Sequence, residues 1–104
     1  MKTIMVRYRT KPEHAEANAA LVRAVFEALR QSTPHRLCDA SYRLSDGVSF
    51  VYVATHAEPD PLSELGAFQA FQAQITERIE APTEVSELFA VGAYGLTPAP
   101  VEAA

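Results

Sequence analysis

Asp46-Gly47 lies between two short segments that are rich in apolar and aromatic residues, and this dipeptide constrains the fold more than any other feature. Both residue types accept the positive φ angles that the tight turns of β-hairpins require. Residues 37–44 and 48–56 are therefore predicted to form two antiparallel strands joined by this turn.

The length of the turn decides which side chains share a face of the hairpin. A two-residue turn pairs Ser45 with Val48, whereas a three-residue loop with a bulge pairs Leu44 with Val48. A slip of one residue moves every side chain of a strand to the opposite face. We take the two-residue turn as the working prediction and keep the bulged loop as the alternative.

The segment before the hairpin is predicted to be a strand followed by a helix. Residues 3–9 alternate between apolar and polar side chains, which indicates a strand. Thr10-Lys11-Pro12-Glu13 has the form of a capping box, so Thr10 is expected to start a helix. Apolar residues then follow helical spacing from Ala15 to about Gln31.

The segment after the hairpin repeats this order in reverse. Asp60-Pro61 is predicted to cap a second helix, with Gly66 as a candidate break within it and Pro82 after its end. The apolar residues at helical spacing in this segment are Leu65, Phe68, Phe71, Ile75 and Ile79. A long fourth strand is expected from Thr83 to Leu96.

The predicted order is β-α-β-β-α-β, which is the ferredoxin-like arrangement of an α+β domain. Two helices then cover one face of a four-stranded antiparallel sheet. The 104 residues suffice for one domain, which we place at residues 1–96. Residues 97–104 are expected to be a flexible C-terminal tail.

Composition narrows the classes of function. The net charge of −4 argues against a nucleic-acid partner, and no apolar run approaches the roughly 20 residues of a membrane helix. Cys38 is the only cysteine and the three histidines are far apart, so we expect neither a disulfide nor a metal site, and no cofactor. These features fit a cytoplasmic protein.

Apolar side chains are expected on both faces of the sheet. In the third predicted strand, Phe50 and Tyr52 point one way while Val51 and Val53 point the other way. Two helices can cover only one face, and an exposed apolar face marks an interaction surface. The simplest cover is a second copy, so we expect a homodimer.

Residues 4–12, 50–53 and 68–71, together with the order of elements, resemble the dimeric α/β-barrel superfamily, and within it the antibiotic biosynthesis monooxygenase-like proteins. The resemblance implies a dimer whose two sheets form one barrel, with a pocket between sheet and helices in each subunit. Some members are cofactor-independent oxygenases of aromatic polyketides, and others degrade haem.

The sequence departs from the residues on which those activities depend. Members with these activities are similar in using a pocket tryptophan with Asn or His, whereas this chain has no tryptophan. Its only asparagine, Asn18, lies in the first predicted helix. Neither activity is transferred residue by residue, and the departure argues against haem degradation.

With the two-residue turn, Asp39 pairs with Ala54, so Asp39 and His56 become diagonal neighbours on one face. A carboxylate beside an imidazole can fix its tautomer and make it a general base. The face as a whole collects Asp39, Ser41, Arg43, Phe50, Tyr52 and His56. With the bulged loop, Tyr42 instead joins Phe50, Tyr52 and His56.

The predicted site lies between the sheet and the second helix. Its catalytic candidate is His56, and its ligand-binding candidates are Arg7, Tyr42, Tyr52, Phe68 and Phe71. For each there is a structural alternative: an exposed or capping histidine, and aromatic rings that belong to the core.

The first hypothesis of function is an oxygenase-type enzyme for an aromatic or planar small molecule. The second is a dimeric binding or accessory protein without catalysis.

Overall fold

The computed structural model describes residues 2–32, 37–57 and 61–95. Its strands are β1 (Lys2–Arg9), β2 (Leu37–Arg43), β3 (Ser49–His56) and β4 (Glu84–Leu88). Its helices are α1 (Ala15–Ser32), α2 (Gly66–Ala73) and the short α3 (Ile75–Arg78), with 3₁₀ turns at Pro12–His14 and Pro61–Glu64. The predicted tail 97–104 and the predicted cap at Asp60 lie outside the described residues.

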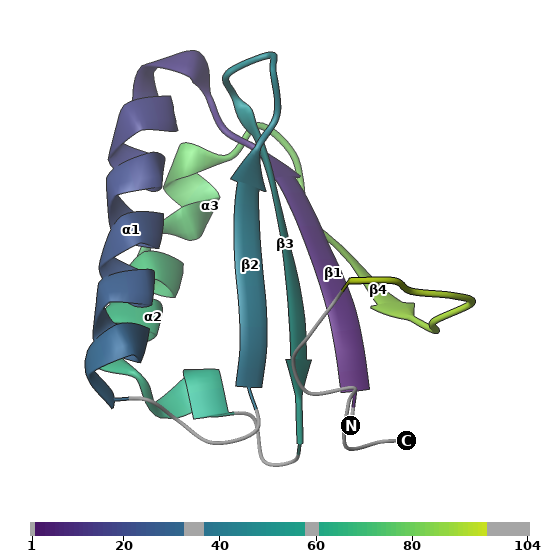
Figure 1. The fold of residues 1–104 in the computed structure, drawn as a ribbon. Coiled ribbons are helices and arrows are strands. Elements are labelled where there is room, and N and C mark those ends of the chain that lie inside the picture. Colours follow the sequence, from purple (N-terminus) through teal and green to yellow (C-terminus); the bar gives the residue numbers. More distant parts are fainter. Residues whose placement is uncertain (1, 33–36, 58–60, 96–104) are drawn as a thin grey trace.

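The four strands form one antiparallel sheet in the order β2-β3-β1-β4. The helices all lie on one side of this sheet, with α1 in front of α2 and α3 (Figure 1). The predicted β-α-β-β-α-β order and the ferredoxin-like fold are therefore confirmed.

The hairpin has the predicted register but a longer connection. Asp39 pairs with Ala54 and Ser41 with Tyr52, as the two-residue turn required. The outermost ladder bond, however, runs from Leu44 N to Ser49 O at 2.8 Å, so residues 45–48 form the connection. The predicted Ser45–Val48 pair is absent from the described ladder, and that part of the prediction is wrong.

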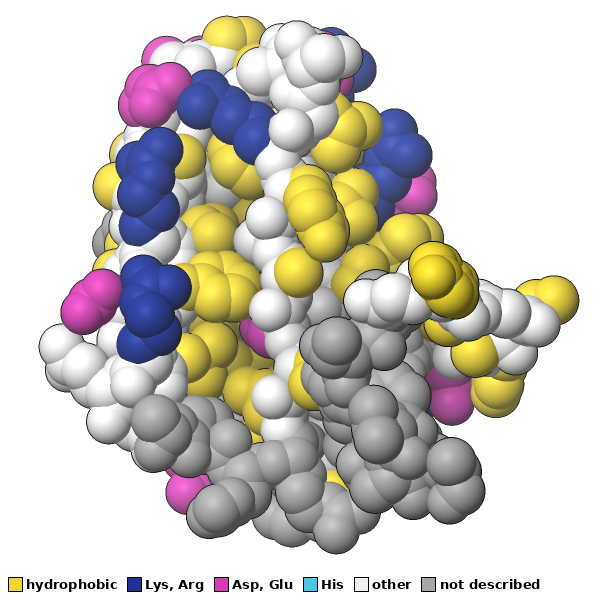
Figure 2. Space-filling model, viewed as in Figure 1, with side chains coloured by type: hydrophobic (Ala, Val, Ile, Leu, Met, Phe, Trp, Pro, Cys, Tyr) yellow, Lys and Arg dark blue, Asp and Glu magenta, His cyan; other side chains and the backbone are white. Residues whose placement is uncertain are grey.

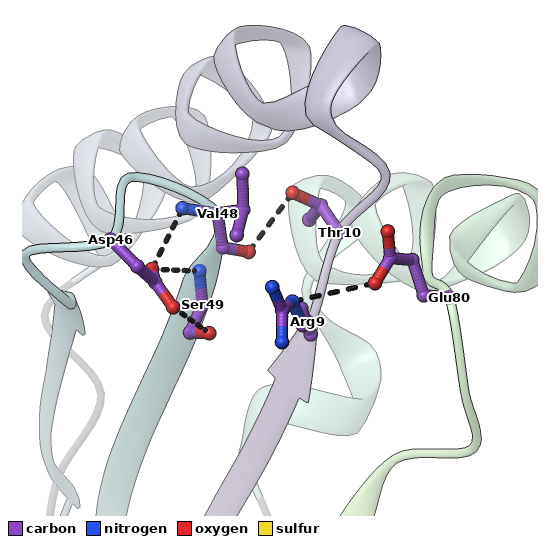
Figure 3. A network of polar contacts seen from close by, with 6 residues as sticks. All are labelled: Arg9, Thr10, Asp46, Val48, Ser49 and Glu80. Atoms are coloured by element: carbon purple, nitrogen blue, oxygen red, sulfur yellow. Dashed lines mark hydrogen bonds and ion pairs between the residues drawn. The ribbon is translucent and has the colours of Figure 1, made fainter.

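The side chain of Asp46 explains the wider connection. Its Oδ1 accepts hydrogen bonds from the backbone N–H groups of Val48 at 2.9 Å and Ser49 at 2.8 Å. Its Oδ2 accepts the Ser49 hydroxyl at 2.6 Å (Figure 3). Gly47 closes the turn with φ +80°, a conformation that glycine adopts without steric cost.

Thr10 does not cap a helix, and the predicted capping box is wrong. Its side chain is fully buried, and its hydroxyl donates to Val48 O at 3.0 Å (Figure 3). Its backbone N–H donates to the same carbonyl at 2.8 Å, and the residue bridges to Ile79. Pairing with the neighbouring strand therefore takes the backbone N–H that Glu13 would bond in a capping box, and it directs the hydroxyl to Val48 and away from the helix. The first turn begins after Lys11 without a side-chain cap.

The second helical region is divided at two places. A break before Gly66 separates a 3₁₀ turn from α2, as predicted, and a second break at Gln74 separates α2 from α3. The fourth strand ends at Leu88, so its predicted extension to Leu96 is wrong. Leu88 pairs with Thr3 near the beginning of β1, and β1 offers little further chain to pair with residues 89–95.

The core lies between the sheet and the helices. The buried cluster consists of Val6, Tyr8, Ala19, Val25, Phe50, Leu62, Phe68 and Phe71. The Tyr8 ring stacks on Phe50 with centroids 5.5 Å apart and meets the edge of Phe71 at 6.1 Å. These rings fix α2 against β1 and β3.

Candidate functional site

The helix-facing side of β2 and β3 carries the predicted polar residues. Directly paired residues of antiparallel strands share a face, and Asp39 pairs with Ala54, which is fully buried beneath the helices. The register therefore places one set of side chains on this face: Leu37, Asp39, Ser41, Arg43, Phe50, Tyr52 and His56. The alternative face, which the bulged loop required, is excluded.

A small pocket opens between α1, α2 and β2. Its lining residues are Val22, Val25, Phe26, Asp39, Ser41, Tyr52, Phe68 and Phe71. Hydrophobic side chains floor the gap between α1 and β2, and acidic atoms lie within it (Figure 2). The cavity volume of about 20 Å³ is room for about one water molecule.

A wider groove continues from this pocket along α1 toward solvent. The two share Val22, Phe26 and Ser41, and the groove has a volume of about 680 Å³. Its remaining lining residues are Ala20, Arg23, Ala24, Glu27 and Arg30. The groove is open to solvent, so a ligand seated there would be enclosed only at its inner end, where the pocket begins.

The structure brings three predicted ligand-binding residues together, because Tyr52, Phe68 and Phe71 all line the pocket. His56 is 4% exposed and its Nδ1 lies 3.2 Å from the carbonyl oxygen of Ala57. It lies two residues beyond Ala54 on the same face of β3, so it is the diagonal neighbour of Asp39, as predicted. His56 itself is not among the residues that line the pocket.

Two predicted ligand-binding residues lie elsewhere. Arg7 of β1 and Tyr42 of β2 both pair with Val51 of β3. All three side chains lie on the face opposite the helices. Tyr42 is 60% exposed. Their assignment to a pocket under α2 is therefore corrected: strand alternation directs both side chains away from it.

Sequence reasoning missed the contribution of α1 to the pocket. Val22, Val25 and Phe26 follow the helical spacing of the first predicted helix. The spacing alone does not show that they face β2 across the pocket. The signal lay in the register, because it places Asp39 and Ser41 on the face that α1 covers. Together these residues make an apolar, aromatic pocket with one carboxylate.

A buried polar network lies behind the pocket and was also missed. Asn18 Nδ2 donates to the Tyr8 hydroxyl at 2.9 Å, and Arg78 Nε donates to Asn18 Oδ1 at 3.1 Å. Arg78 Nη2 donates to the Phe71 carbonyl at 2.6 Å, and its guanidinium lies 5.3 Å from the Phe71 ring centroid. Burial raises the pKa of Tyr8 and lowers the pKa of Arg78.

Within the described residues, no three His, Cys, Asp or Glu side chains gather as metal ligands. Cys38 is half-buried on β2, on the side of the sheet opposite the pocket. None of the helices in the described parts of the chain is long and apolar enough to cross a membrane.

Comparison with known proteins finds likeness in structure only. No protein-family model matches the sequence, and no curated protein matches it. The Rv0793 protein of Mycobacterium tuberculosis has a TM-score of 0.71 at 18% identity, over 88% of this chain and 96% of that one. The PA3566 protein of Pseudomonas aeruginosa has a TM-score of 0.72 at 16% identity, over 88% and 94%.

A third solved structure, named antibiotic biosynthesis monooxygenase, has a TM-score of 0.69 at 20% identity, over 88% of this chain and all of that one. Identities this low establish the fold and leave the activity open. The resemblance that the sequence indicated is thus confirmed for the architecture: the chain has the ferredoxin-like fold of proteins called antibiotic biosynthesis monooxygenases.

Proposed function

We propose that this chain is an antibiotic-biosynthesis-monooxygenase-like protein that binds an aromatic or planar small molecule between α1, α2 and the sheet. The observation that carries the proposal is the pocket itself, whose described lining combines Tyr52, Phe68 and Phe71 with the carboxylate of Asp39. Aromatic walls with few polar groups are typical of sites for planar organic ligands.

The chemistry that fits this site is oxidation by dioxygen without a bound cofactor. A base removes a proton from an activated CH₂ group of the ligand, and the resulting carbanion passes its electrons to O₂. One oxygen atom ends in a new carbonyl group, and the other leaves as water with both hydrogens. We assign the base to His56, because its diagonal position next to Asp39 favours a fixed tautomer. His56 does not line the pocket, so the proton passes to it through Asp39, which does.

A second candidate function is ligand binding without catalysis. Two observations favour it: the inner cavity holds only about one water molecule, and the chain has no tryptophan. In this role Asp39 and the aromatic walls select the ligand, and His56 is a buried structural residue.

One experiment separates these functions. The purified protein is mixed with an anthrone, a planar three-ring ketone with an activated CH₂ group, and O₂ uptake is followed with an electrode. An oxygenase consumes one O₂ for each quinone formed, and His56→Ala and Asp39→Asn each lower the rate about a hundredfold. His14→Ala is the matched control, because His14 lies in the 3₁₀ turn before α1, outside the lining residues.

The outcomes are distinct. Binding of the anthrone without O₂ uptake removes the oxygenase and leaves the binding protein. Full turnover by the His56→Ala variant removes the assigned base. Absence of both binding and turnover removes the proposed class of ligand.

We also propose that the protein is a homodimer that covers the open face of the sheet. Met5, Val51, Val53 and Leu88 share this face with the exposed Tyr42. Beyond β4, Phe89 is 77% exposed, and Val91 and Tyr94 are completely exposed. This segment projects away from the rest of the fold (Figure 1). Apolar surface of this kind supports an interface with a second copy.

A further inference from the structure

The outer groove beside α1 has a cationic rim. Arg23 and Arg30 lie two helical turns apart and both line it, together with Glu27. Arg30 Nη2 lies 3.3 Å from Glu27 Oε1, and Glu27 Oε2 also accepts a hydrogen bond from Gln31. Among the described residues no ion pair engages Arg23. The described residues that line the outer groove therefore carry one net positive charge, at Arg23.

The inner end of the same cavity has the opposite character. Asp39 is the charged residue among the described residues that line the pocket, and Ser41 and Tyr52 are its polar neighbours. Val22 and Phe26 line both pocket and groove, so an apolar floor joins the carboxylate to the cationic rim. An ionised carboxylate accepts hydrogen bonds and donates none.

The two ends of the site therefore carry opposite charges, positive at Arg23 and negative at Asp39. We infer that the site selects a planar ligand with an anionic group at one end and a hydrogen-bond donor at the other. The anion, a carboxylate, binds Arg23 at the outer rim, because a guanidinium fork matches a carboxylate. The donor, a phenolic hydroxyl or an amino group, points inward to Asp39. A second carboxylate at the inner end is rejected by repulsion from Asp39. The inference rests on the proposed binding of a planar molecule and adds its charge pattern.

Four naphthalene probes test the inference on the full chain. They are 6-hydroxy-2-naphthoate with both groups, 2-naphthol without the anion, 2-naphthoate without the hydroxyl, and naphthalene-2,6-dicarboxylate with an anion at each end. Because the chain has no tryptophan, the fluorescence of each probe reports its binding directly. We expect 6-hydroxy-2-naphthoate to bind tightest and the dicarboxylate to bind weakest.

Matched variants assign the two ends. Arg23→Gln is expected to lower the affinity for 6-hydroxy-2-naphthoate about fivefold, since an exposed ion pair contributes modestly. It is expected to leave the affinity for 2-naphthol unchanged. Lys11→Gln removes the same charge outside the lining residues and is expected to change neither. Asp39→Asn is expected to admit the dicarboxylate, with a gain of about fivefold over wild type.

The results separate this inference from the proposed function. Equal affinity for 2-naphthol and 6-hydroxy-2-naphthoate overturns the anion site while planar binding stands. An Arg23→Gln variant that loses the same affinity for 2-naphthol as for 6-hydroxy-2-naphthoate also overturns it, because the arginine would then not be binding the carboxylate. Failure of all four probes to bind overturns both the inference and the proposed class of ligand.

Discussion

At the scale of single residues, Arg78 is the side chain whose placement most needs a physical account. It is 6% exposed, and its hydrogen-bond partners are the neutral oxygens of Asn18 and Phe71. Burial of a charge costs free energy unless the charge is hydrogen-bonded. The bond to Phe71 O also satisfies a carbonyl in the last turn of α2, where a cation interacts favourably with the helix dipole. Arg78 thus ties α3 to α1 and to the last turn of α2.

Replacement of Arg78 by Met should lower the free energy of unfolding by about 3 kcal/mol. The variant keeps apolar volume but leaves the oxygens of Asn18 and Phe71 without their donor. Urea unfolding measures the difference. Arg30→Met is the control, because Arg30 is exposed and the change should stay within about 0.5 kcal/mol. A loss below about 1 kcal/mol in Arg78→Met would contradict the structural role of the network.

Asp46 gives the protein a dependence of stability on acid pH. Its hydrogen bonds from the Ser49 hydroxyl and from the Ser49 and Val48 backbones lower its pKa from 3.8 to about 2. Because the folded pKa is depressed, the carboxylate stabilises the fold above about pH 4, and this contribution is lost as the pH falls toward 2.

Asp46→Asn tests this dependence by thermal unfolding at a series of pH values. The wild type should have the higher Tm at pH 5, and the difference should shrink steadily between pH 4 and pH 2. A difference that stays constant over this range would show that the charge of Asp46 does not support the hairpin connection.

At the scale of elements, the sequence predicts those structures that depend on nearby residues. Alternation located β1, and the apolar segments around Asp46-Gly47 located the hairpin and its register. Thr10 was misread because a capping box describes local geometry, whereas the carbonyl that binds Thr10 belongs to Val48, 38 residues away. The end of β4 was misread for the same reason, since it depends on where β1 begins.

The candidate site was predictable to a similar extent. The register was enough to place Asp39, Tyr52 and His56 on one face. Helical spacing indicated that Phe68 and Phe71 face the core, but the pairing of α1 with that face requires the packed structure. Arg7 and Tyr42 have side chains suited to ligand binding, but strand alternation places both on the face opposite the pocket.

Two glycines offer a matched test of the helix and hairpin conformations. A Cβ at Gly66, the first residue of α2, meets no atom within 4 Å, so Gly66→Ala should stabilise the fold by about 0.5 kcal/mol. Gly47 also has open space, but its φ of +80° strains any other residue. Gly47→Ala should therefore destabilise the fold by about 1 kcal/mol. Urea unfolding of both variants checks the opposite signs, and equal signs would contradict the assigned conformations.

At the scale of the whole molecule, the two faces of the sheet differ in how much of their apolar surface is covered. The helices bury one face around Phe50 and Ala54, while the other carries the half-buried Val51 and Val53 and the exposed Tyr42. A soluble monomer seldom exposes a continuous apolar face of several hundred Å². The proposed dimer resolves this difference and leaves the pocket beneath the helices of each copy accessible.

Val53→Glu tests the dimer at the centre of the open face. Native mass spectrometry should give a dimer for the wild type and a monomer for the variant, because two like charges would meet across the interface. Circular dichroism should show the fold retained. Gln72→Glu adds the same charge on the exposed side of α2 and should remain a dimer. A dimeric Val53→Glu variant would place the interface elsewhere.

The exposed side chains beyond β4 have a consequence for how stability must be defined. If Phe89, Val91 and Tyr94 are covered only when two copies meet, folding and association form one equilibrium. Each tenfold dilution then removes about 1.4 kcal/mol per dimer. Such a chain has no single melting temperature. Its thermal stability depends on the protein concentration, so the protein would unfold at a lower temperature in a cell that makes few molecules than in one that makes many.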